Sequence, residues 1–295
     1  MNDRGWLVQA VEQFTQWLAN IVIERITNEP KEKQTMEILL DGRNALITGG
    51  SQGLGRAMAK EFCQSGANVA IVARRQEVLD TAAADIKKTG RGKVLTIAAD
   101  VSTAQGCEKA YAAAVDGLGQ VDILVNNAGS SARGPFELVS DADWQADLDL
   151  KLFAAIRLYR LVLPGMKKRR FGRIINTLNT GAKAPQAEGA PTAVSRAAGM
   201  ALTKILSKEG AAHNVLVNAM LVGKIRSNQW ERRYEASGSN ESLEAYYEND
   251  GKNLPMGRLG LAEEFAAMAC FLASDAGGYI SGAAINVDGA LSPVV

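Results

Sequence analysis

The chain has 295 residues, of which 47% are hydrophobic, so it can bury the core of one α/β domain of about 250 residues plus a short appendage. Its 33 basic and 32 acidic residues leave a formal charge of +1, which argues against nucleic-acid binding and favours a small-molecule partner. No run of about 18 apolar residues occurs, and the N-terminus lacks the features of a signal peptide, so neither a membrane span nor secretion is expected.

The three cysteines, Cys63, Cys107 and Cys270, are scattered along the chain without the spacing of metal ligands. Two of them lie in alanine-rich helical stretches, where a buried thiol behaves as a small apolar residue. We therefore expect no metal site and a reducing, cytoplasmic environment.

Residues 1–36 are predicted to form an amphipathic helix followed by a polar linker. Apolar side chains recur at helical spacing as far as Val22, and Pro30 stops the pattern. Trp6 and Trp17 widen the apolar stripe, so another surface is expected to cover it. The polar face carries mostly amide and acidic side chains instead of the lysines and arginines of a membrane-surface helix, which favours packing on another subunit or on the chain's own domain.

From residue 37 to residue 295, short apolar segments alternate with helical patterns. This alternation predicts a single Rossmann-like domain with a doubly wound parallel sheet, whose ligands bind outside the carboxyl ends of the strands. The predicted strands are 44–48, 68–73, 93–98, 123–126, 172–178, 215–220 and 284–287. One predicted helix begins at residue 54. The others span 76–87, 103–117, 141–168, 191–210 and 262–274.

The first predicted strand leads directly into a glycine-rich turn, TGGSQGLG, at residues 48–55. Glycines allow backbone N–H groups to approach a pyrophosphate at the positive end of the following helix. An ordinary glycine-rich loop is the alternative, but the strand before and the helix after the turn favour a dinucleotide site. The binding residues predicted here are Gly49, Ser51, Gln52, Gly53, Leu54 and Gly55.

The second strand ends at Ala73 and is followed by Arg74 and Arg75. An NAD-binding protein would place a carboxylate here for the 2′-hydroxyl of the adenosine ribose. A small residue followed by guanidinium groups suits a 2′-phosphate instead, so NADP(H) is the predicted cofactor. Alternatively, the two arginines only solvate the end of a strand.

Two further motifs, DV at Asp100 and Val101 and NNAG at residues 126–129, follow the third and fourth strands. Asp100 could accept a hydrogen bond from the adenine amino group. In their order and spacing, TGGSQGLG, ARR, DV and NNAG resemble the classical short-chain dehydrogenase/reductase family, and RLGLAEEFAAMACFLASDAGGYISGAAINVDGA resembles its closing helix and strand. The resemblance covers about residues 37–292 and implies an oxidoreductase, a homotetramer or homodimer, and a cofactor site that also includes Asn127, Ala128 and Gly129.

The resemblance also places the family's catalytic Asn, Ser, Tyr and Lys at Lys151, Asn179, Thr192 and Arg196, so all four residue types differ. Thr192 is a poor proton donor on its own, because an aliphatic hydroxyl is far less acidic than a phenol. Asn179 could still donate an amide N–H to a carbonyl oxygen. Arg196 could still bind the nicotinamide ribose, although it cannot relay a proton.

Lys151 is the replacement that adds titratable chemistry. Burial and a nearby Arg196 would lower its pKa, which would make it a candidate acid or base. Together the two cations would suit an anionic substrate or a developing enolate. The alternative is a lysine that extends out of the cleft into solvent.

Residues 224–256 are predicted to form a lid over a partly apolar substrate, with Ser227 placed to bind the nicotinamide carboxamide in the resemblance. The lid's large side chains could equally be subunit contacts; they are Trp230, Tyr234, Tyr246, Tyr247 and Met256. Lys183 and Glu188 are second-line candidates for the cleft. His213 is expected at the surface.

The leading hypothesis is an NADP(H)-dependent oxidoreductase that acts on a carbonyl, alcohol or activated alkene with an unusual proton donor. One alternative is a non-redox enzyme with lyase-type or enolate chemistry, which the pair of Lys151 and Arg196 suggests. The other is a nucleotide-binding scaffold without turnover, which the altered catalytic positions and the N-terminal helix suggest.

Overall fold

Parallel strands pair into a single sheet in the computed structural model, which describes residues 12–18 and 38–295. Within these residues the strands are β1 (Asn44–Thr48), β2 (Asn68–Ala73), β3 (Val94–Ala98), β4 (Ile123–Asn126), β5 (Gly172–Asn179), β6 (Val215–Val222) and β7 (Ala284–Val287). Their order is β3-β2-β1-β4-β5-β6-β7, so the winding direction reverses between β1 and β4. Ligands of doubly wound sheets bind at such a reversal.

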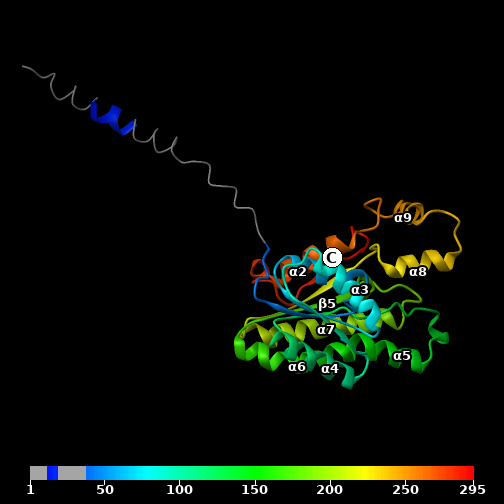
Figure 1. Ribbon diagram of the computed structural model, residues 1–295. Coiled ribbons are helices and arrows are strands. Elements are labelled where there is room, and N and C mark those ends of the chain that lie inside the picture. The colour runs from blue at the N-terminus through cyan, green and yellow to red at the C-terminus, as the bar shows by residue number, and fades with distance from the viewer. Residues whose placement is uncertain (1–11, 19–37) are drawn as a thin grey trace, which may run out of the picture. The chain divides into compact units, whose positions relative to one another are not determined.

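Helices cover both faces of the sheet (Figure 1). The helices α2 (Gly53–Gln64), α3 (Gln76–Lys87) and α10 (Ala262–Ala273) pack on one face, and α4 (Ala104–Leu118), α6 (Ala154–Arg169) and α7 (Thr192–Ala211) on the other. Successive residues of β1 serve opposite cores: Ala45 and Ile47 pack with α2, whereas Leu46 packs with α4 and α6. This two-sided burial explains the unbroken apolar runs of the central strands.

The predicted doubly wound fold is confirmed, and the predicted bounds of β1, β2, β4 and β7 agree with the structure. The predicted single helix over 141–168 is wrong in one respect. In the structure this stretch consists of α5 (Asp141–Leu148), a π-helical segment η2 (Asp149–Phe153) and α6. A π-helical turn inserts an extra residue without changing the apolar content, so sequence periodicity does not reveal it.

Local side chains set the start of the helices that flank the site. Thr103 caps α4 by accepting a hydrogen bond from Gly106 N–H at 3.0 Å. Ser140 and Asp143 form a reciprocal capping box at the start of α5, with bonds of 3.2 and 3.1 Å. Such caps satisfy N–H groups that a helix leaves unpaired at its start.

The predicted lid contains two helices, α8 (Asn228–Ser237) and α9 (Leu243–Gly251), which lie together at one end of the sheet (Figure 1). Trp230, Tyr247 and Leu259 form a small apolar core between them and the following loop. These side chains therefore fold the lid on itself.

In the N-terminal segment, residues 12–18 are helical, and the rings of Phe14 and Trp17 stack with centroids 5.7 Å apart. Both side chains are exposed, at 59% and 57%. The rest of the predicted helix and the predicted linker lie outside the described residues. Among the residues that are described, no helix is long and apolar enough to cross a membrane.

Candidate functional site

A cavity of about 960 Å³ is lined by residues that follow the carboxyl ends of β1, β2, β3, β4, β5 and β6. Most of the predicted site residues line it: Gly49, Ser51, Gln52, Gly53, Leu54, Arg74, Asp100, Val101, Asn127, Ala128, Gly129, Asn179, Thr192, Arg196 and Ser227. Gly55, Arg75 and Lys151 do not. The fold thus brings the predicted cofactor motifs and three of the four predicted catalytic residues to one cavity.

The glycine-rich turn is shaped by the conformations and packing of its glycines. Gly49 and Gly53 have φ of +65° and +52°, which side chains rarely allow. A Cβ at Gly55 would lie 2.1 Å from the carbonyl oxygen of Gly49, so Gly55 is needed for packing inside the turn. Gln52 makes no side-chain cap to α2, which leaves N–H groups at the helix start available to an anion.

Thr48 and Asn127 hold the ends of β1 and β4 together. Thr48 Oγ1 accepts hydrogen bonds from the backbone N–H groups of Asn127 and Ala128 at 2.9 and 3.0 Å. Asn127 Nδ2 donates to the carbonyl oxygens of Thr48 and Gly49 at 3.0 and 3.2 Å. Asn127 therefore fixes the shape of the glycine-rich turn in addition to lining the cavity.

The two arginines after β2 differ in their positions. Arg74 lines the main cavity and an adjoining hollow of about 450 Å³ that it shares with Asp100 and Lys109. Arg75 is the exposed residue before α3 and lines neither space. Within the described chain neither arginine forms an ion pair, so the guanidinium of Arg74 is free for a phosphate.

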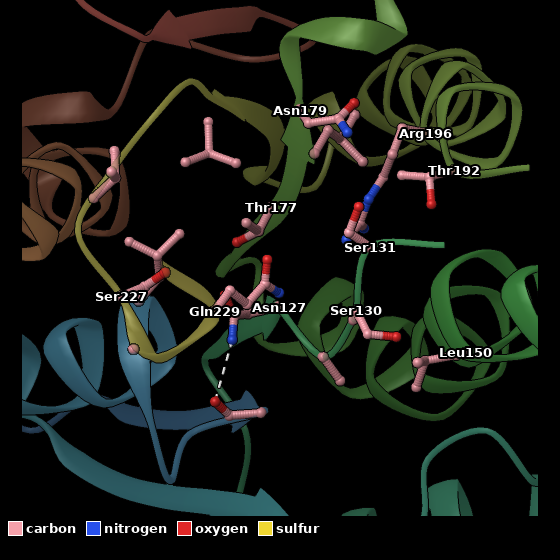
Figure 2. Close-up of a pocket in the computed structure, with 18 of the residues that line it drawn as sticks. Asn127, Ser130, Ser131, Leu150, Thr177, Asn179, Thr192, Arg196, Ser227 and Gln229 are labelled. Carbon is pink, nitrogen blue, oxygen red and sulfur yellow. Dashed lines mark hydrogen bonds between the residues drawn. The ribbon is translucent and has the colours of Figure 1, made fainter. Parts of the chain in front are cut away.

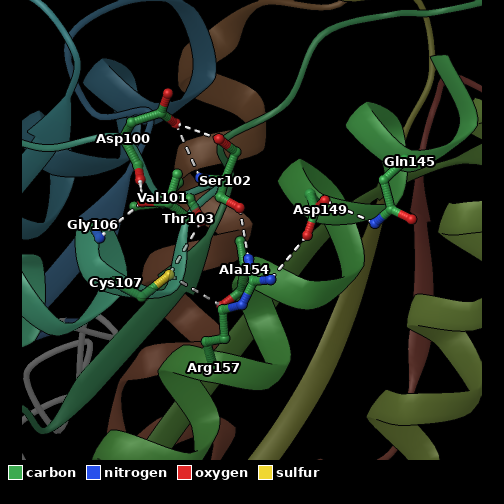
Figure 3. A network of polar contacts seen from close by, with 10 residues as sticks. All are labelled: Asp100, Val101, Ser102, Thr103, Gly106, Cys107, Gln145, Asp149, Ala154 and Arg157. Carbon is green, nitrogen blue, oxygen red and sulfur yellow. Dashed lines mark hydrogen bonds and ion pairs between the residues drawn. The ribbon is translucent and has the colours of Figure 1, made fainter. Parts of the chain in front are cut away.

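A polar network connects the loop after β3 to the π-helical segment (Figure 3). Asp100 Oδ1 accepts hydrogen bonds from the backbone N–H and the hydroxyl of Ser102, at 3.0 and 2.8 Å. Arg157 donates to the carbonyl oxygen of Ser102 at 2.6 Å and to Asp149 Oδ1 at 2.9 Å. Through Arg157, the predicted adenine loop is thus bonded to the first residue of η2.

Lys151 lies in η2, and its side chain is 1% exposed. Its Nζ forms an ion pair and a hydrogen bond with Asp147 and donates to Thr192 Oγ1 at 2.6 Å. The other oxygen of Asp147 accepts from the Ser195 hydroxyl at 2.6 Å. We call these four side chains, Asp147, Lys151, Thr192 and Ser195, the buried cluster. The alternative of a solvated Lys151 is therefore wrong, and its ammonium lies behind Thr192 instead of lining the cavity.

Burial lowers the pKa of Lys151 from its ordinary value, the hydrogen bond to Asp147 opposes that change, and the charge of Arg196 adds to it. This is the direction that the sequence predicts. The counter-charge of Asp147 was not predicted, although this residue stands four positions before Lys151. With Asp147 beside it, the protonated lysine adds little net positive charge to the cavity.

Thr192, the first residue of α7, links the buried cluster to the cavity. Its Oγ1 accepts from the backbone N–H of Ala132 at 3.0 Å and donates to the Ala132 carbonyl oxygen at 2.7 Å. A hydroxyl has one proton to donate, so a substrate oxygen would have to compete with this carbonyl for it.

Asn179 and Thr177 project from the same face of β5 into the cavity (Figure 2). Asn179 Oδ1 and Thr177 Oγ1 are buried and have no hydrogen-bond partner among the described residues. An unpaired buried polar atom costs about 1–3 kcal/mol. A ligand that supplies donors at this point would remove that cost.

Arg196 lies one turn after Thr192 and lines the cavity (Figure 2). A Cβ at Gly129 would come within 2.6 Å of its Nη2, so a side chain there would displace this guanidinium. Burial lowers the pKa of Arg196 to about 10, and the charge of Asp147 opposes the change. The group is still a cation at neutral pH.

The remaining predicted residues have mixed positions. Ser227 lines the cavity just before α8, and the next residue, Asn228, donates to Gln52 Oε1 at 2.9 Å. Lys183 does not line the cavity; its Nζ donates to Ala284 O and Asn286 Oδ1 at 2.7 and 2.9 Å. Glu188 is exposed outside the lining, and His213 precedes the amino end of β6, away from the cavity. Of the lid's large side chains, Trp230 lines the cavity, whereas Tyr234, Tyr246, Tyr247 and Met256 do not.

Sequence reasoning missed two sets of residues. Asp147 and Ser195 complete the buried cluster, and the spacing of Asp147 four residues before Lys151 on a helix was the available signal. Arg133, Arg232 and Arg233 line the cavity from two distant segments, and no local pattern distinguishes them from surface arginines.

Comparisons with known proteins agree with this fold. A family model described as short chain dehydrogenase matches residues 43–237. The chain is 33% identical over 257 residues to a 3-oxoacyl-(acyl-carrier-protein) reductase of Chlamydia pneumoniae. This alignment covers 87% of this chain and 100% of the relative. It is 32% identical over 255 residues to a D-beta-hydroxybutyrate dehydrogenase of Cupriavidus necator, with coverages of 85% and 98%. The solved structure of L-sorbose reductase from Gluconobacter frateurii, complexed with NADPH and L-sorbose, has a TM-score of 0.84 and 32% identity, over 88% of this chain and 100% of that chain.

Proposed function

Because this chain belongs to the short-chain dehydrogenase family and is a short-chain oxidoreductase, we propose that it uses NADP(H) to interconvert a carbonyl compound and an alcohol, or to reduce an activated alkene. One observation carries the proposal. A single cavity runs from the glycine-rich turn and Arg74 to Thr192 and Arg196, so cofactor and substrate can meet at the altered catalytic positions.

The residues present fit the cofactor. The glycines of the turn and the uncapped start of α2 would hold the pyrophosphate, and Arg74 would hold the 2′-phosphate. Arg196 and Ser227 would bind the nicotinamide end, beside the unpaired acceptors on β5. When bound, NADPH supplies a hydride to the substrate.

Proton transfer in this proposal uses Thr192 with Lys151 behind it. Thr192 gives its hydroxyl proton to the substrate oxygen, and Lys151 Nζ, 2.6 Å from Thr192 Oγ1, replaces that proton. Lys151 is then neutral beside Asp147 until it regains a proton. Because burial lowers the pKa of Lys151, this loss costs less than it would for a solvated lysine. Asn179 Nδ2 can donate to the same substrate oxygen and orient it.

The alternatives make different demands on the same residues. Enolate chemistry that relies on a direct charge from Lys151 is disfavoured, because the lysine lies behind Thr192 and is paired with Asp147. A scaffold without turnover is favoured by the hydroxyl of Thr192, which already donates to the protein. Turnover that depends on Thr192 would exclude the scaffold.

The experiment is a parallel titration of the purified protein with NADPH and NADH, followed by nicotinamide fluorescence. We expect NADPH to bind about tenfold or more tightly than NADH, and Arg74→Ala to remove most of that preference. Arg75→Ala is the matched comparison and should change the preference much less, because Arg75 lies outside the cavity lining.

A panel of aldehydes, ketones and enones with bound NADPH then tests turnover. Reduction of any member that is lost in Thr192→Val supports the proposal. Equal affinity for both nucleotides would contradict the predicted role of Arg74, and tight NADPH binding without any turnover would favour the scaffold.

A further inference from the structure

Besides Arg74, four guanidinium groups line the cavity from three separate elements. Arg133 lies in the loop after β4, Arg196 lies on α7, and Arg232 and Arg233 lie on α8. In the part of the chain that the structure describes, none of the four forms an ion pair or donates a hydrogen bond. Arg133, Arg232 and Arg233 are exposed side chains, so an anion in the cavity would find three cations on its lining.

Two neighbouring cations of the lid are paired with carboxylates. Arg226 forms two hydrogen bonds with Glu244, at 2.9 and 2.8 Å, and Lys224 lies 3.1 Å from Asp250. The acidic residues of the lining do not supply the missing charge. Asp149 bonds to Arg157, and Asp100 bonds to Ser102 on the loop after β3.

The cofactor does not account for all of these cations. Its pyrophosphate belongs at the glycine-rich turn and its 2′-phosphate at Arg74, and Arg196 is assigned to the nicotinamide ribose. Arg133, Arg232 and Arg233 are therefore left for the substrate. Arg133 directly follows Ala132, whose backbone exchanges two hydrogen bonds with Thr192, so this guanidinium belongs to the segment that positions the proton donor.

One of the two guanidinium groups on α8, that of Arg233, lies over an aromatic ring. The Arg233 Cζ lies 4.7 Å from the centroid of the Trp230 ring. A stacked guanidinium keeps its N–H groups directed outward in a fixed plane, which suits the two oxygens of a carboxylate or phosphate. Trp230 itself is buried in the small apolar core of the lid and also lines the cavity.

We propose that the substrate carries an anionic group, a carboxylate or a phosphate, near its reacting carbonyl, and that Arg133, Arg232 and Arg233 bind this group. The proposal rests on the proposed function. It assigns the specificity of the enzyme to residues outside the altered catalytic positions.

Pairs of aldehydes that differ in charge test the proposal. The carboxylate pair is 4-carboxybenzaldehyde and methyl 4-formylbenzoate, and the phosphate pair is D-glyceraldehyde 3-phosphate and D-glyceraldehyde. We expect kcat/KM with NADPH to be about tenfold or more higher for the anionic member of at least one pair, and which pair responds distinguishes carboxylate from phosphate. Arg133→Ala and the double variant Arg232→Ala/Arg233→Ala should remove this preference, mainly by raising KM, while kcat/KM for the neutral member stays within about twofold.

Arg160→Ala is the matched control, because Arg160 is an exposed arginine on α6 outside the cavity lining. It should leave the preference for the anionic member unchanged. Equal or better turnover of both neutral members would overturn the proposal, as would an equal loss for charged and neutral substrates in the arginine variants.

If no aldehyde is reduced, a binding measurement decides the proposal separately from the proposed function. Benzoate and inorganic phosphate are titrated by calorimetry into the NADPH-loaded protein and its arginine variants. Binding of either anion that is lost in Arg133→Ala and Arg232→Ala/Arg233→Ala supports the anion site without turnover. Absence of binding, or binding that the variants retain, overturns it.

Discussion

At the scale of single residues, the burial of Lys151 depends on one carboxylate. Both side chains of the ion pair are 1% exposed, so each charge would be uncompensated without the other. Removing one partner of a buried pair costs about 3–5 kcal/mol, whereas replacing both with apolar residues of similar volume is often neutral. The pair is therefore expected to be coupled in stability as well as in chemistry.

We predict that Asp147→Leu lowers the free energy of unfolding by about 3–5 kcal/mol, because the Lys151 ammonium loses its counter-charge. The double variant Asp147→Leu/Lys151→Met should recover most of this loss. Urea denaturation followed by circular dichroism measures both values. Additive losses in the double variant would show that the two residues are not coupled.

The pH dependence of turnover tests the proton path through Thr192. Carbonyl reduction needs protonated Lys151, so kcat should fall as the pH rises through the pKa of Lys151, which burial places below its ordinary value. Alcohol oxidation needs the neutral amine and should rise over the same pH range. In Lys151→Arg this change of kcat with pH should disappear, because a guanidinium does not release its proton in this pH range. The effect is measured as kcat against pH at saturating NADPH. The same fall of kcat with pH in Lys151→Arg would exclude Lys151 as its origin.

Thr192 is tested directly by removing or keeping its hydroxyl. Thr192→Val should lower kcat by about 100-fold or more, as expected when a general acid is lost, and Thr192→Ser should keep much of the activity. Steady-state kinetics with NADPH measure both variants. Because Thr192 also bonds to Ala132, the melting temperature of each variant is the control for a structural effect. A similar loss of kcat in both variants would assign Thr192 a packing role.

Residues that act through local motifs were predictable, and residues that act through distant contacts were not. Gly49, Arg74 and Asn127 belong to short patterns beside strand ends, and the parallel sheet brings all strand ends of one polarity to one edge. Arg133 and Arg232 meet in one cavity only because the chain folds, and nothing local marks them. The position of Lys151 was predictable by analogy, but its orientation depends on Asp147 and on a π-helical turn.

At the scale of elements, the turn between β1 and α2 tolerates little change. We predict that Gly55→Ala weakens NADPH binding about tenfold or more and lowers the melting temperature, because the new Cβ would lie 2.1 Å from the Gly49 carbonyl oxygen. Gly134→Ala is the matched control, since a Cβ there meets nothing within 4 Å. Nucleotide titration and thermal melts measure the two variants. Normal binding by Gly55→Ala would mean that the turn can rearrange.

The strands were easier to predict than the helix that carries Lys151. A strand buried on both faces is a short apolar run bounded by turn residues, and that pattern fixes its ends closely. The change from α- to π-helix at Asp149 leaves hydrophobic periodicity almost intact, so no such pattern marks it. In the structure it coincides with the contact of Arg157 with Asp149 and Ser102.

At the scale of the whole molecule, a formal charge of +1 conceals an uneven distribution. Among the described residues, Arg74, Arg133, Arg196, Arg232 and Arg233 line one cavity and form none of the printed ion pairs. Composition therefore argues against a broad basic surface, but it does not show whether basic residues gather locally. A concentrated positive potential of this kind would attract an anionic substrate, and the attraction would weaken as salt increases.

The N-terminal segment provides the last prediction, which concerns assembly. Phe14 and Trp17 expose more than half of their surface. Because exposed apolar side chains are unfavourable in water, we expect another surface to cover them. We propose a homotetramer or homodimer in which this helix adds to an interface. A chain that begins at residue 36 should then show fewer subunits per particle by light scattering, or the same number with a lower melting temperature. Phe14→Ser/Trp17→Ser in the full chain should reproduce the effect, because it removes the apolar pair and keeps the length. An unchanged number of subunits and unchanged stability in both proteins would contradict this role of the helix.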